Sequence, residues 1–553
     1  MDEFKEAIIK FLKKETNIES IELEAPPSSE MGDYAFPCFI LAKELKKSPN
    51  EIAQELSKKF RPSNLISGAK VIGPYLNFFV NKNEIAESTI KEVLKKKDEY
   101  GSSNIGKGKK ILVEHTSINP NASPHVGRAR NALIGDSIVR ILQFQSYKVE
   151  THYFINDVGK QVAMLVLGAE EKKSVGFDDL LKIYIDINKE IEENPELEKK
   201  VLGLLNLLEK GDKKIKQRFE KIVKTCVNGQ LNILSELGIK YDFFDYESKY
   251  LWDKKTEEAL KRLEKTGKLF IDGFNRWILD QKGYGLGMKV PVLVLTRGDG
   301  TSLYPLRDIA YNLDKLKKGD NIIILGEDQK LYQEQIAAVL KELELKLPRV
   351  VHYSFVLLQE GKMSTRKGNL ILLEDFMREA VNKASGELKK RYNEVDNKSA
   401  KIIAYGAIKF GILKVSPEKN VIFDWDQALS FEGETAPYTQ YAYARISSIL
   451  KKNKKANLKA DLKLLAEKEE IELIKLISNF PEIISKATND LRPHLIAAYL
   501  YSLAQKFNEY YHLHQILKAD EKIKDARILL INAIRQVIKN GLNLLGINVL
   551  EKM

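Results

Sequence analysis

Two short segments far apart in the chain carry residue types suited to phosphate chemistry. The first is Pro124-His125-Val126-Gly127-Arg128, which follows a turn-rich loop and opens a helical pattern. The backbone N–H groups and the dipole at such a helix start favour an anion. Gly127 would let that anion approach the main chain closely, and the Arg128 guanidinium can bind phosphate through two N–H groups. The segment therefore predicts a phosphate site.

The second segment is a basic turn that ends in glycine, Lys362-Met363-Ser364-Thr365-Arg366-Lys367-Gly368. Taken alone, Lys362-Met363-Ser364 would more often be an exposed surface turn. Taken with His125, it becomes a candidate for the opposite wall of the phosphate site. A phosphoryl group in transfer needs cations and donors held in place around it, because charge builds on its oxygens.

The pattern around the first segment predicts a strand, a loop, a helix and a second strand. Residues 111–113 form an apolar run that ends in Glu114, and residues 147–154 have the pattern of another strand. Between them, apolar residues recur at steps of three and four, at Ile134, Ile138, Ile141 and Leu142. Further apolar strands at 290–296 and 321–326 alternate with helical stretches. We expect a parallel, doubly wound α/β sheet that binds ligands at the carboxyl ends of its strands.

These segments resemble a known family. His125-Val126-Gly127-Arg128 resembles the first signature of class I aminoacyl-tRNA synthetases, normally His-x-Gly-His, and residues 362–368 resemble their Lys-Met-Ser-Lys loop. The strings at 113–136 and 303–311 are similar to arginyl-tRNA synthetases in particular. The resemblance implies a Rossmann-type catalytic domain. It also implies that the chain makes arginyl-adenylate from L-arginine and ATP and transfers the arginine to the terminal ribose of arginine tRNA.

The resemblance assigns catalysis and ATP binding to the two signatures. Catalytic roles are implied for His125, Gly127, Arg128, Lys362, Met363 and Ser364, and ATP contacts for Pro124, His125, Gly127, Arg128, Met363, Thr365 and Arg366. Two positions depart from the family pattern, because Arg128 replaces the second histidine and Thr365 replaces the second lysine. Arginine cannot supply a neutral imidazole but keeps an anion-binding group. Arg366 or Lys367 could supply the missing cation.

A guanidinium substrate needs carboxylates, ideally in a bidentate arrangement, because lysine must be excluded. The residues that the resemblance implies for arginine binding are Glu114, Asn119, Glu247, Tyr304, Asp308, Asp328 and Gln329. Asp308 and Tyr304 would face the guanidinium, whereas Glu114 and Asn119 would hold the amino and carboxyl groups. Without the resemblance, Asp308 beside Arg307 would more often be a surface ion pair and Tyr304 a core aromatic.

The resemblance also divides the chain into three domains. Residues 1–100 would form a small N-terminal α/β domain that contacts the tRNA elbow, and residues 101–420 the catalytic domain. Residues 421–553, where the pattern appears helical to the end, would form an anticodon-binding bundle. The residues implied for tRNA binding are Asn77, Phe78, Phe79, Tyr438, Tyr441, Arg445 and Met553. The alternative for Phe78 or Phe79 is a core position, because neighbours in a strand point to opposite faces.

A charged helical stretch at about 168–240 is expected to be an insertion within the catalytic domain. Its loop signals are Gly176, Pro195 and Gly211. We interpret most of its charge as a solvated helix surface.

Composition limits the class of protein. Lys and Arg number 89 against 77 Asp and Glu, a net charge of +12. This excess suits a polyanion such as nucleic acid, although solvated lysine runs explain it equally well. No apolar run reaches the ~18 residues that cross a bilayer, and the acidic, helical N-terminus is unlike a signal peptide. Cys38 and Cys226 are too few and too far apart to suggest a structural metal site. We therefore expect a cytoplasmic protein without a membrane partner; from the resemblance we further expect a monomer that uses Mg²⁺ with its nucleotide.

Three alternatives were weighed against this interpretation. A small nucleotidyltransferase shares the His-x-Gly-His signature but would not need a large helical domain after the second signature. A non-catalytic RNA-binding paralogue would be expected to have lost His125, Lys362 or Asp308, and all three are present. A cysteinyl-tRNA synthetase would need a cluster of cysteine and histidine zinc ligands, which this sequence lacks.

Overall fold

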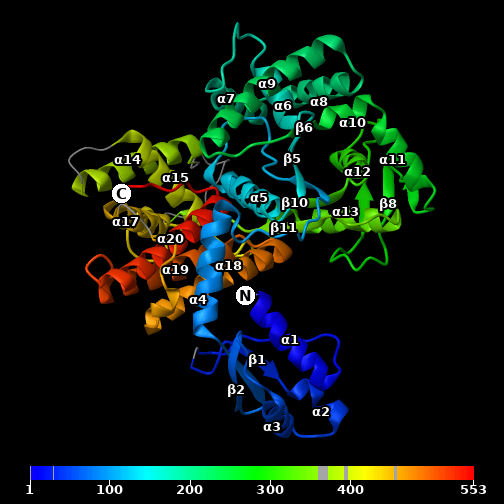
Figure 1. Ribbon diagram of the computed structural model, residues 1–553. Coiled ribbons are helices and arrows are strands. Elements are labelled where there is room, and N and C mark those ends of the chain that lie inside the picture. The colour runs from blue at the N-terminus through cyan, green and yellow to red at the C-terminus, as the bar shows by residue number, and fades with distance from the viewer. Residues whose placement is uncertain (1, 29, 359–370, 392–395, 454–456) are drawn as a thin grey trace.

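The computed structural model describes residues 2–28, 30–358, 371–391, 396–453 and 457–553. In Figure 1 the N-terminal module lies at the bottom, the parallel sheet with its helices at the top and right, and the C-terminal helices on the left. This arrangement confirms the expected fold class, an α/β domain with a small N-terminal module and a helical C-terminal part.

The N-terminal module is a three-stranded antiparallel sheet, in the order β1-β3-β2, with helices packed on it. Its elements are α1 (Asp2–Thr16), β1 (Tyr34–Pro37), α2 (Phe39–Leu45), α3 (Pro49–Lys59), β2 (Ile66–Ile72) and β3 (Tyr75–Val80). Helix α3 begins with Pro49 and a capping box between Ser48 and Glu51, which satisfies backbone N–H groups at its start. Side chains alternate along β3, so Phe78 is buried in the core while Phe79 is half-buried on the other face.

A long helix attaches this module to the C-terminal helices. Helix α4 (Lys82–Lys96) and the turn η1 (Lys97–Glu99) pack against α18 (Lys468–Asp490) and α20 (Glu521–Leu544). The Tyr100 hydroxyl donates to the Ile477 carbonyl at 2.8 Å, and the Asn540 amide donates to the carbonyls of Lys97 and Tyr100 at 2.9 and 3.0 Å. These buried bonds fix the end of α4 to the helical bundle.

The central sheet has five parallel strands in the order β11-β10-β4-β5-β6. The strands are β4 (Lys110–Glu114), β5 (Lys148–Ile155), β6 (Phe243–Tyr246), β10 (Asp320–Gly326) and β11 (Arg349–Tyr353). The chain leaves β4 through α5 (Val126–Phe144) to β5 on one side, and later returns through β10 on the other. The crevice at the carboxyl ends of β4 and β10 is therefore the topological switch point, where doubly wound sheets bind ligands.

One predicted strand belongs to another sheet. The apolar run at 290–296 yields β9 (Val292–Val294), which pairs antiparallel with β8 (Trp277–Asp280), next to β7 (Leu269–Ile271). The expectation that it joins the parallel sheet is wrong. An apolar run does not show which strand it pairs with, and here β8 lies close in sequence and takes the pairing. Helices α10 (Glu247–Trp252), α11 (Lys255–Glu264), α12 (Tyr304–Lys315) and α13 (Lys330–Glu342) and the turn η2 (Glu327–Gln329) complete this region.

The charged stretch after β5 is helical, as predicted. It consists of α6 (Lys160–Gly168), α7 (Asp179–Glu193), α8 (Glu196–Glu209) and α9 (Lys213–Glu236), which lie together at the top of Figure 1. Each of the last three buries an apolar stripe, including Ile183 and Ile187 of α7 and Val201 and Leu205 of α8.

The C-terminal part begins with a strand rather than a helix. Strand β13 (Val421–Phe423) pairs in parallel with β12 (Val356–Leu358). The expected all-helical pattern from residue 421 is therefore wrong for its first three residues, and helices follow from there. Helices α14 (Leu373–Arg391) and α15 (Asn397–Leu413) precede this strand, and α16 (Trp425–Ala428), α17 (Ala436–Lys452), η4 (Leu462–Leu464), α18, α19 (His494–Leu513) and α20 follow it.

Candidate active site

The first signature lies where β4 has ended and α5 begins. His125 is the residue that precedes the helix, in an extended conformation, and the positive end of the helix dipole lies at this point. The Pro124 carbonyl accepts from Leu373 N at 2.7 Å, and Val126 N donates to the Ile371 carbonyl at 3.2 Å. The chain that follows residues 359–370 thus returns to the first signature. Lys362, Met363, Ser364, Thr365 and Arg366 themselves lie outside the described residues.

The surroundings of His125 favour the neutral form of its imidazole. Burial, assisted by the charge of Arg128, lowers the pKa of the His125 imidazole to about 4. Its Nδ1 atom is buried and has no hydrogen-bond partner among the described residues. Gly127 and Arg128 are half-buried in the first turn of α5. At neutral pH, His125 is therefore an uncharged imidazole beside a permanent cation.

The Asn131 side chain holds the loop between β4 and α5 in place through two hydrogen bonds. Its side-chain oxygen accepts from Thr116 N at 2.6 Å, and its amide donates to the Ile324 carbonyl of β10 at 2.8 Å. Thr116 and Ser117 have positive φ angles of 82° and 41°, which are uncommon for such residues. One buried side chain thus joins the strand end, the helix and the neighbouring strand at the switch point.

Three carboxylates predicted to bind arginine lie near one another, with Glu114 and Glu247 buried and Asp308 half-buried. Glu114 ends β4, Glu247 begins α10 and Asp308 lies on α12. The charges of Glu114 and Glu247 both raise the pKa of Asp308. The structure therefore brings these three groups into one region, although they come from three elements.

Glu114 and Glu247 each contact a cation from α12. Glu114 is bonded to the buried ammonium of Lys315, which also lies 4.1 Å above the Tyr311 ring. Glu247 Oε1 accepts from Arg307 Nε at 2.6 Å, while Oε2 is buried with no partner among the described residues. Lys315 was not foreseen, and Arg307 was expected only to pair with Asp308 on a surface.

Asp308 differs from these two carboxylates because its hydrogen-bond donors are neutral. The Tyr332 hydroxyl donates to Oδ2 at 2.8 Å and the Asn312 amide to Oδ1 at 2.9 Å. Burial raises the pKa of Asp308 to about 6, against the opposing charge of Lys315. The Tyr304 ring lies 4.9 Å from that of Tyr332 and is 52% exposed, so it is not the core aromatic of the alternative interpretation. The pair forms an aromatic wall beside the half-buried Asp308 carboxylate.

The remaining predicted arginine contacts lie at the mouth of the crevice. Asn119 is exposed and its amide donates to Gln161 Oε1 at 3.0 Å. Asp328 is exposed and Gln329 half-buried, both in the turn η2 that directly follows β10. Asp328 and Gln329 therefore lie at a strand end, as expected.

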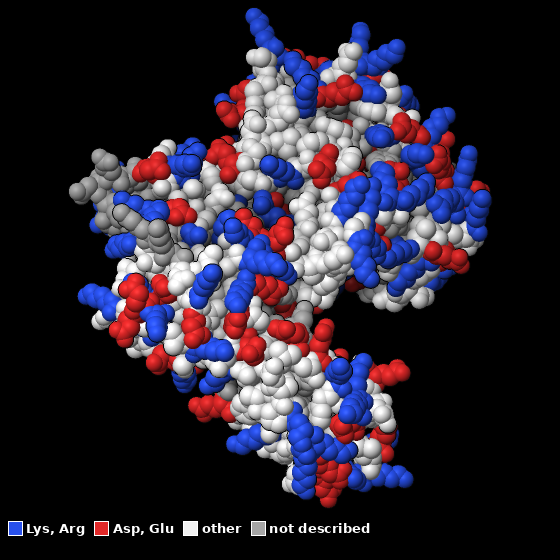
Figure 2. All heavy atoms as spheres, viewed as in Figure 1, with Lys and Arg blue, Asp and Glu red and all other residues white. Residues whose placement is uncertain are grey.

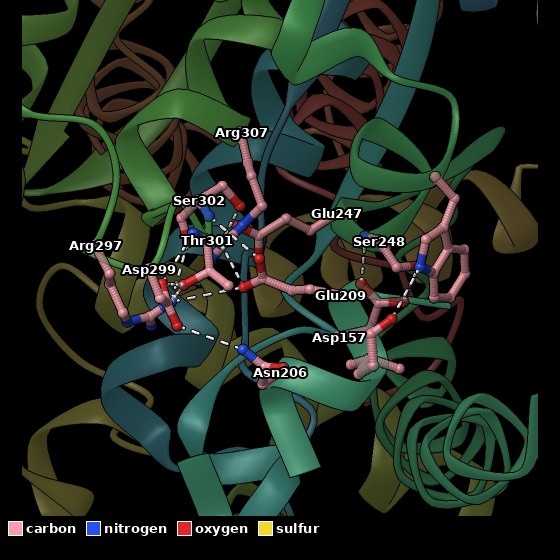
Figure 3. Close-up of polar contacts among 12 residues, drawn as sticks. Asp157, Asn206, Glu209, Glu247, Ser248, Arg297, Asp299, Thr301, Ser302 and Arg307 are labelled. Atoms are coloured by element: carbon pink, nitrogen blue, oxygen red, sulfur yellow. Dashed lines mark hydrogen bonds and ion pairs between the residues drawn. The ribbon is translucent and has the colours of Figure 1, made fainter. Parts of the chain in front are cut away.

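A further carboxylate was missed by the sequence interpretation. Glu209 ends α8 of the insertion, and it accepts from Ser302 N at 3.2 Å and lies near Arg297 and Arg307 (Figure 3). Burial raises its pKa, opposed by the charge of Arg307. The helical stretch is thus more than a solvated surface, because one of its carboxylates reaches Arg307, the partner of Glu247.

The predicted tRNA contacts differ in their exposure. Asn77 and Phe78 are buried: the Asn77 amide donates to the Met31 carbonyl at 2.8 Å, and the Phe78 ring packs in the core. Neither can touch a nucleotide in this conformation, whereas Phe79 is half-buried. Met553 is also buried, with its side chain in the core.

Tyr438, Tyr441 and Arg445 line one cavity of about 1030 Å³ between α14, the segment at 425–432, α17 and α19. The Arg445 guanidinium lies 4.7 Å from the Tyr441 ring and 4.8 Å from the Tyr511 ring, and donates to Asn508 Oδ1 at 2.7 Å. The cavity therefore offers aromatic faces and a cation side by side.

The described residues contain no group of three or more His, Cys, Asp or Glu side chains placed to hold a metal ion. Within the same part of the chain, no helix is both long and apolar enough to cross a bilayer.

The switch-point crevice and the signature at the start of α5 define a class I aminoacyl-tRNA synthetase. A model described as tRNA synthetases class I (R), catalytic domain matches residues 89–425. An arginyl tRNA synthetase N terminal domain matches residues 1–80, and a DALR anticodon binding domain matches residues 439–553. The chain belongs to the arginyl-tRNA synthetase family.

Relatives span the whole chain. The chain is 40% identical to an arginine–tRNA ligase of Methanocaldococcus jannaschii, over 98% of this chain and 97% of that protein. It is 37% identical to an arginine–tRNA ligase of Halothermothrix orenii, over 100% of both. Among solved structures, the arginyl-tRNA synthetase of Thermus thermophilus superposes with a TM-score of 0.85 at 26% identity, covering 99% of each chain.

Proposed function

We propose that this chain carries out the arginine–tRNA ligase reaction of its family in the crevice at the carboxyl ends of β4 and β10. The arginine carboxylate attacks the α-phosphate of ATP and expels pyrophosphate. A ribose hydroxyl at the tRNA terminus then attacks the adenylate carbonyl and releases AMP. Charge develops on substrate oxygens in both steps, so the chain's task is to position the reactants and stabilise that charge.

The start of α5 would bind the phosphates of ATP. The helix N-terminus supplies N–H groups, the neutral His125 can donate one hydrogen bond, and Arg128 adds a permanent charge. Pro124 and Gly127 would form the wall against the nucleotide. Lys362, Met363, Ser364, Thr365 and Arg366 would act from the other side, a role that rests on the sequence alone.

Asp308 would bind the substrate guanidinium, and this assignment carries the choice of arginine. It is half-buried, its present donors are neutral, and Tyr304 and Tyr332 form an aromatic wall beside it. The unpartnered Oε2 of Glu247 would be a second acceptor. At the other end of the substrate, Glu114 would accept from the α-ammonium and Asn119 would face the carboxylate. Asp328 and Gln329 would line the mouth.

Arginine tRNA would contact three parts of the chain. The C-terminal cavity, with Tyr438, Tyr441 and Arg445, offers stacking faces for anticodon bases, and Phe79 is the remaining candidate in the N-terminal module. Figure 2 shows the molecule hollowed between that module and the catalytic region, with Lys and Arg side chains gathered around α13 above the hollow. Positive charge there would attract the phosphate backbone.

The finer organisation follows from the same assignment. ATP would act as its Mg²⁺ complex, without a structural metal in the protein. The chain would work as a cytoplasmic monomer, with domains at 1–100, 101–420 and 421–553.

Replacement of Asp308 tests the assignment of the arginine site. Asp308→Asn should raise the arginine KM roughly a hundredfold, corresponding to the ~3 kcal/mol expected when a buried charged partner is lost. The KM for ATP should be unchanged. Asp314→Asn, on the same helix but in a partly exposed pair with Lys318, is the matched control. Arginine kinetics equal to those of the control would remove Asp308 from the site.

A further inference from the structure

Most charged groups around the proposed arginine site contact a group of opposite charge, and Asp308 is the exception. Lys315 contacts Glu114, and Arg307 contacts Glu247. Glu209, whose side chain is 10% exposed, lies 3.6 Å from Arg297 Nη1 and 3.9 Å from Arg307 Nη1. Among the described residues, Asp308 has no ion-pair partner, since only Tyr332 and Asn312 donate to it.

The insertion supplies the third carboxylate of this arrangement. Glu209 is the last residue of α8, and three residues earlier Asn206 donates to Asp299 Oδ2 at 3.4 Å. Glu209 itself accepts from Ser302 N, directly before α12. Figure 3 shows the end of α8 facing the turn from Arg297 to Ser302, with Glu209 between the two guanidinium groups. The helix end therefore contacts the turn that leads into the helix carrying Asp308.

We propose that Glu209 is a positioning residue for arginine binding: it balances the charges of Arg297 and Arg307, so that Asp308 and the unpartnered Oε2 of Glu247 remain available to the substrate guanidinium. The proposal rests on the proposed role of Asp308 and adds to it an electrostatic role for the helical insertion. Without Glu209, Arg297 and Arg307 would lose the carboxylate that lies between them, and the more positive local field would disfavour a cationic substrate. Such repulsion is strong in a partly buried site, where the effective dielectric is low.

Glu209→Gln is the direct test because it removes the charge and keeps an oxygen that can accept from Ser302 N. We expect the arginine KM to rise about tenfold, the size of effect that one unit charge has at short range in a partly buried site. The ATP KM and kcat should stay as in the unmodified chain. The matched control is Glu198→Gln, on the same helix in an exposed pair with Lys160, which should change none of these values.

A compensating variant shows whether Glu209 acts by balancing charge or only by supporting the turn from Arg297 to Ser302. Arg297→Gln in the Glu209→Gln background removes the excess cation, so the arginine KM should return toward its original value. Arg297→Gln alone leaves an excess of negative charge and should lower the arginine KM. An unchanged KM in Glu209→Gln, or no recovery in the double variant, would overturn the proposal.

The same kinetic measurements test the role of Glu209 separately from the proposed role of Asp308 in binding arginine. Loss of arginine binding in Asp308→Asn with normal kinetics in Glu209→Gln would refute the role of Glu209 alone. Normal arginine kinetics in Asp308→Asn would refute the site assignment, and the role of Glu209 with it.

Discussion

The proposed role of Asp308 requires an ionised carboxylate, but its burial disfavours the ionised form. Burial raises its pKa to about 6, so below that pH the carboxyl is largely protonated and neutral. A guanidinium prefers the ionised form, and its binding must then release the proton. The residue is therefore poised so that the substrate itself stabilises the charged state.

Arginine affinity should accordingly depend on pH. The sign follows from the raised pKa: affinity is full above pH 6 and falls as pH drops below it, by about tenfold for each unit. Calorimetric titration of arginine into the free protein between pH 5 and 8 measures this. Residual binding by Asp308→Asn should lack the same inflection. A wild-type affinity that does not change between pH 5 and 7 would contradict the stated protonation of Asp308.

Lys315 should matter for stability as well as for binding. It is almost fully buried against Glu114 and the Tyr311 ring, so Lys315→Met would leave a buried carboxylate without its cation. We expect a loss of ~3 kcal/mol, typical of a broken buried pair, seen as a lower thermal midpoint of the transition that includes the catalytic domain. Lys318→Met, in a partly exposed pair with Asp314, should have almost no effect. The double change of Lys315→Met and Glu114→Gln should recover part of the loss; equal midpoints for the two lysine variants would refute the account.

At the scale of elements, the β4–loop–α5 unit could be predicted, because the sequence patterns that indicate it lie next to one another in the chain. The apolar run of β4, the turn-rich loop and the helical period of α5 lie next to one another in the sequence, and the structure places them as expected. Contacts between distant elements leave no such signal. Glu209 meets Ser302 across 93 residues, and no pattern in the insertion distinguishes that carboxylate from its solvated neighbours. Strand β9 was assigned to the wrong sheet for the same reason.

Helix α5 also shows which glycine the core requires. A Cβ at Gly135 would lie 2.3 Å from the buried His115 ring, so Gly135→Ala should destabilise the protein by ~1–3 kcal/mol through overpacking. Gly203, on the exposed face of α8, has open space around it, and Gly203→Ala should stabilise by roughly 0.5–1 kcal/mol because alanine loses less backbone entropy. Thermal unfolding of both variants tests the pair. A Gly135→Ala variant as stable as Gly203→Ala would mean that the α5–His115 packing is looser than described.

At the scale of the molecule, the candidate arginine site and the C-terminal cavity lie in different parts of the fold, joined through α5 and the helices packed on it. Asp308 and Tyr304 were predicted because their string resembles the family, and their role in arginine binding stays a prediction. Asn77 and Phe78 were proposed on the same ground but are buried, since a sequence match does not show which face of a strand carries the function. Met553 likewise packs in the core.

Tyr441→Ala tests the proposed anticodon role of the cavity. Loss of one stacking face should raise the KM for arginine tRNA by the equivalent of ~1–3 kcal/mol, while the salt dependence of that KM stays the same, because no phosphate contact is removed. Leu458→Ala, at an exposed position of the same domain that does not line the cavity, is the control. A changed kcat at saturating tRNA, with the KM unchanged, would refute the assignment.

The most direct test of the central claim is ATP–pyrophosphate exchange by the full chain with each amino acid in turn, with and without total tRNA. Exchange is expected with arginine alone among the amino acids tested, and it should be strongest when tRNA is present. Exchange with lysine or cysteine, or none with arginine in the presence of tRNA, would contradict it.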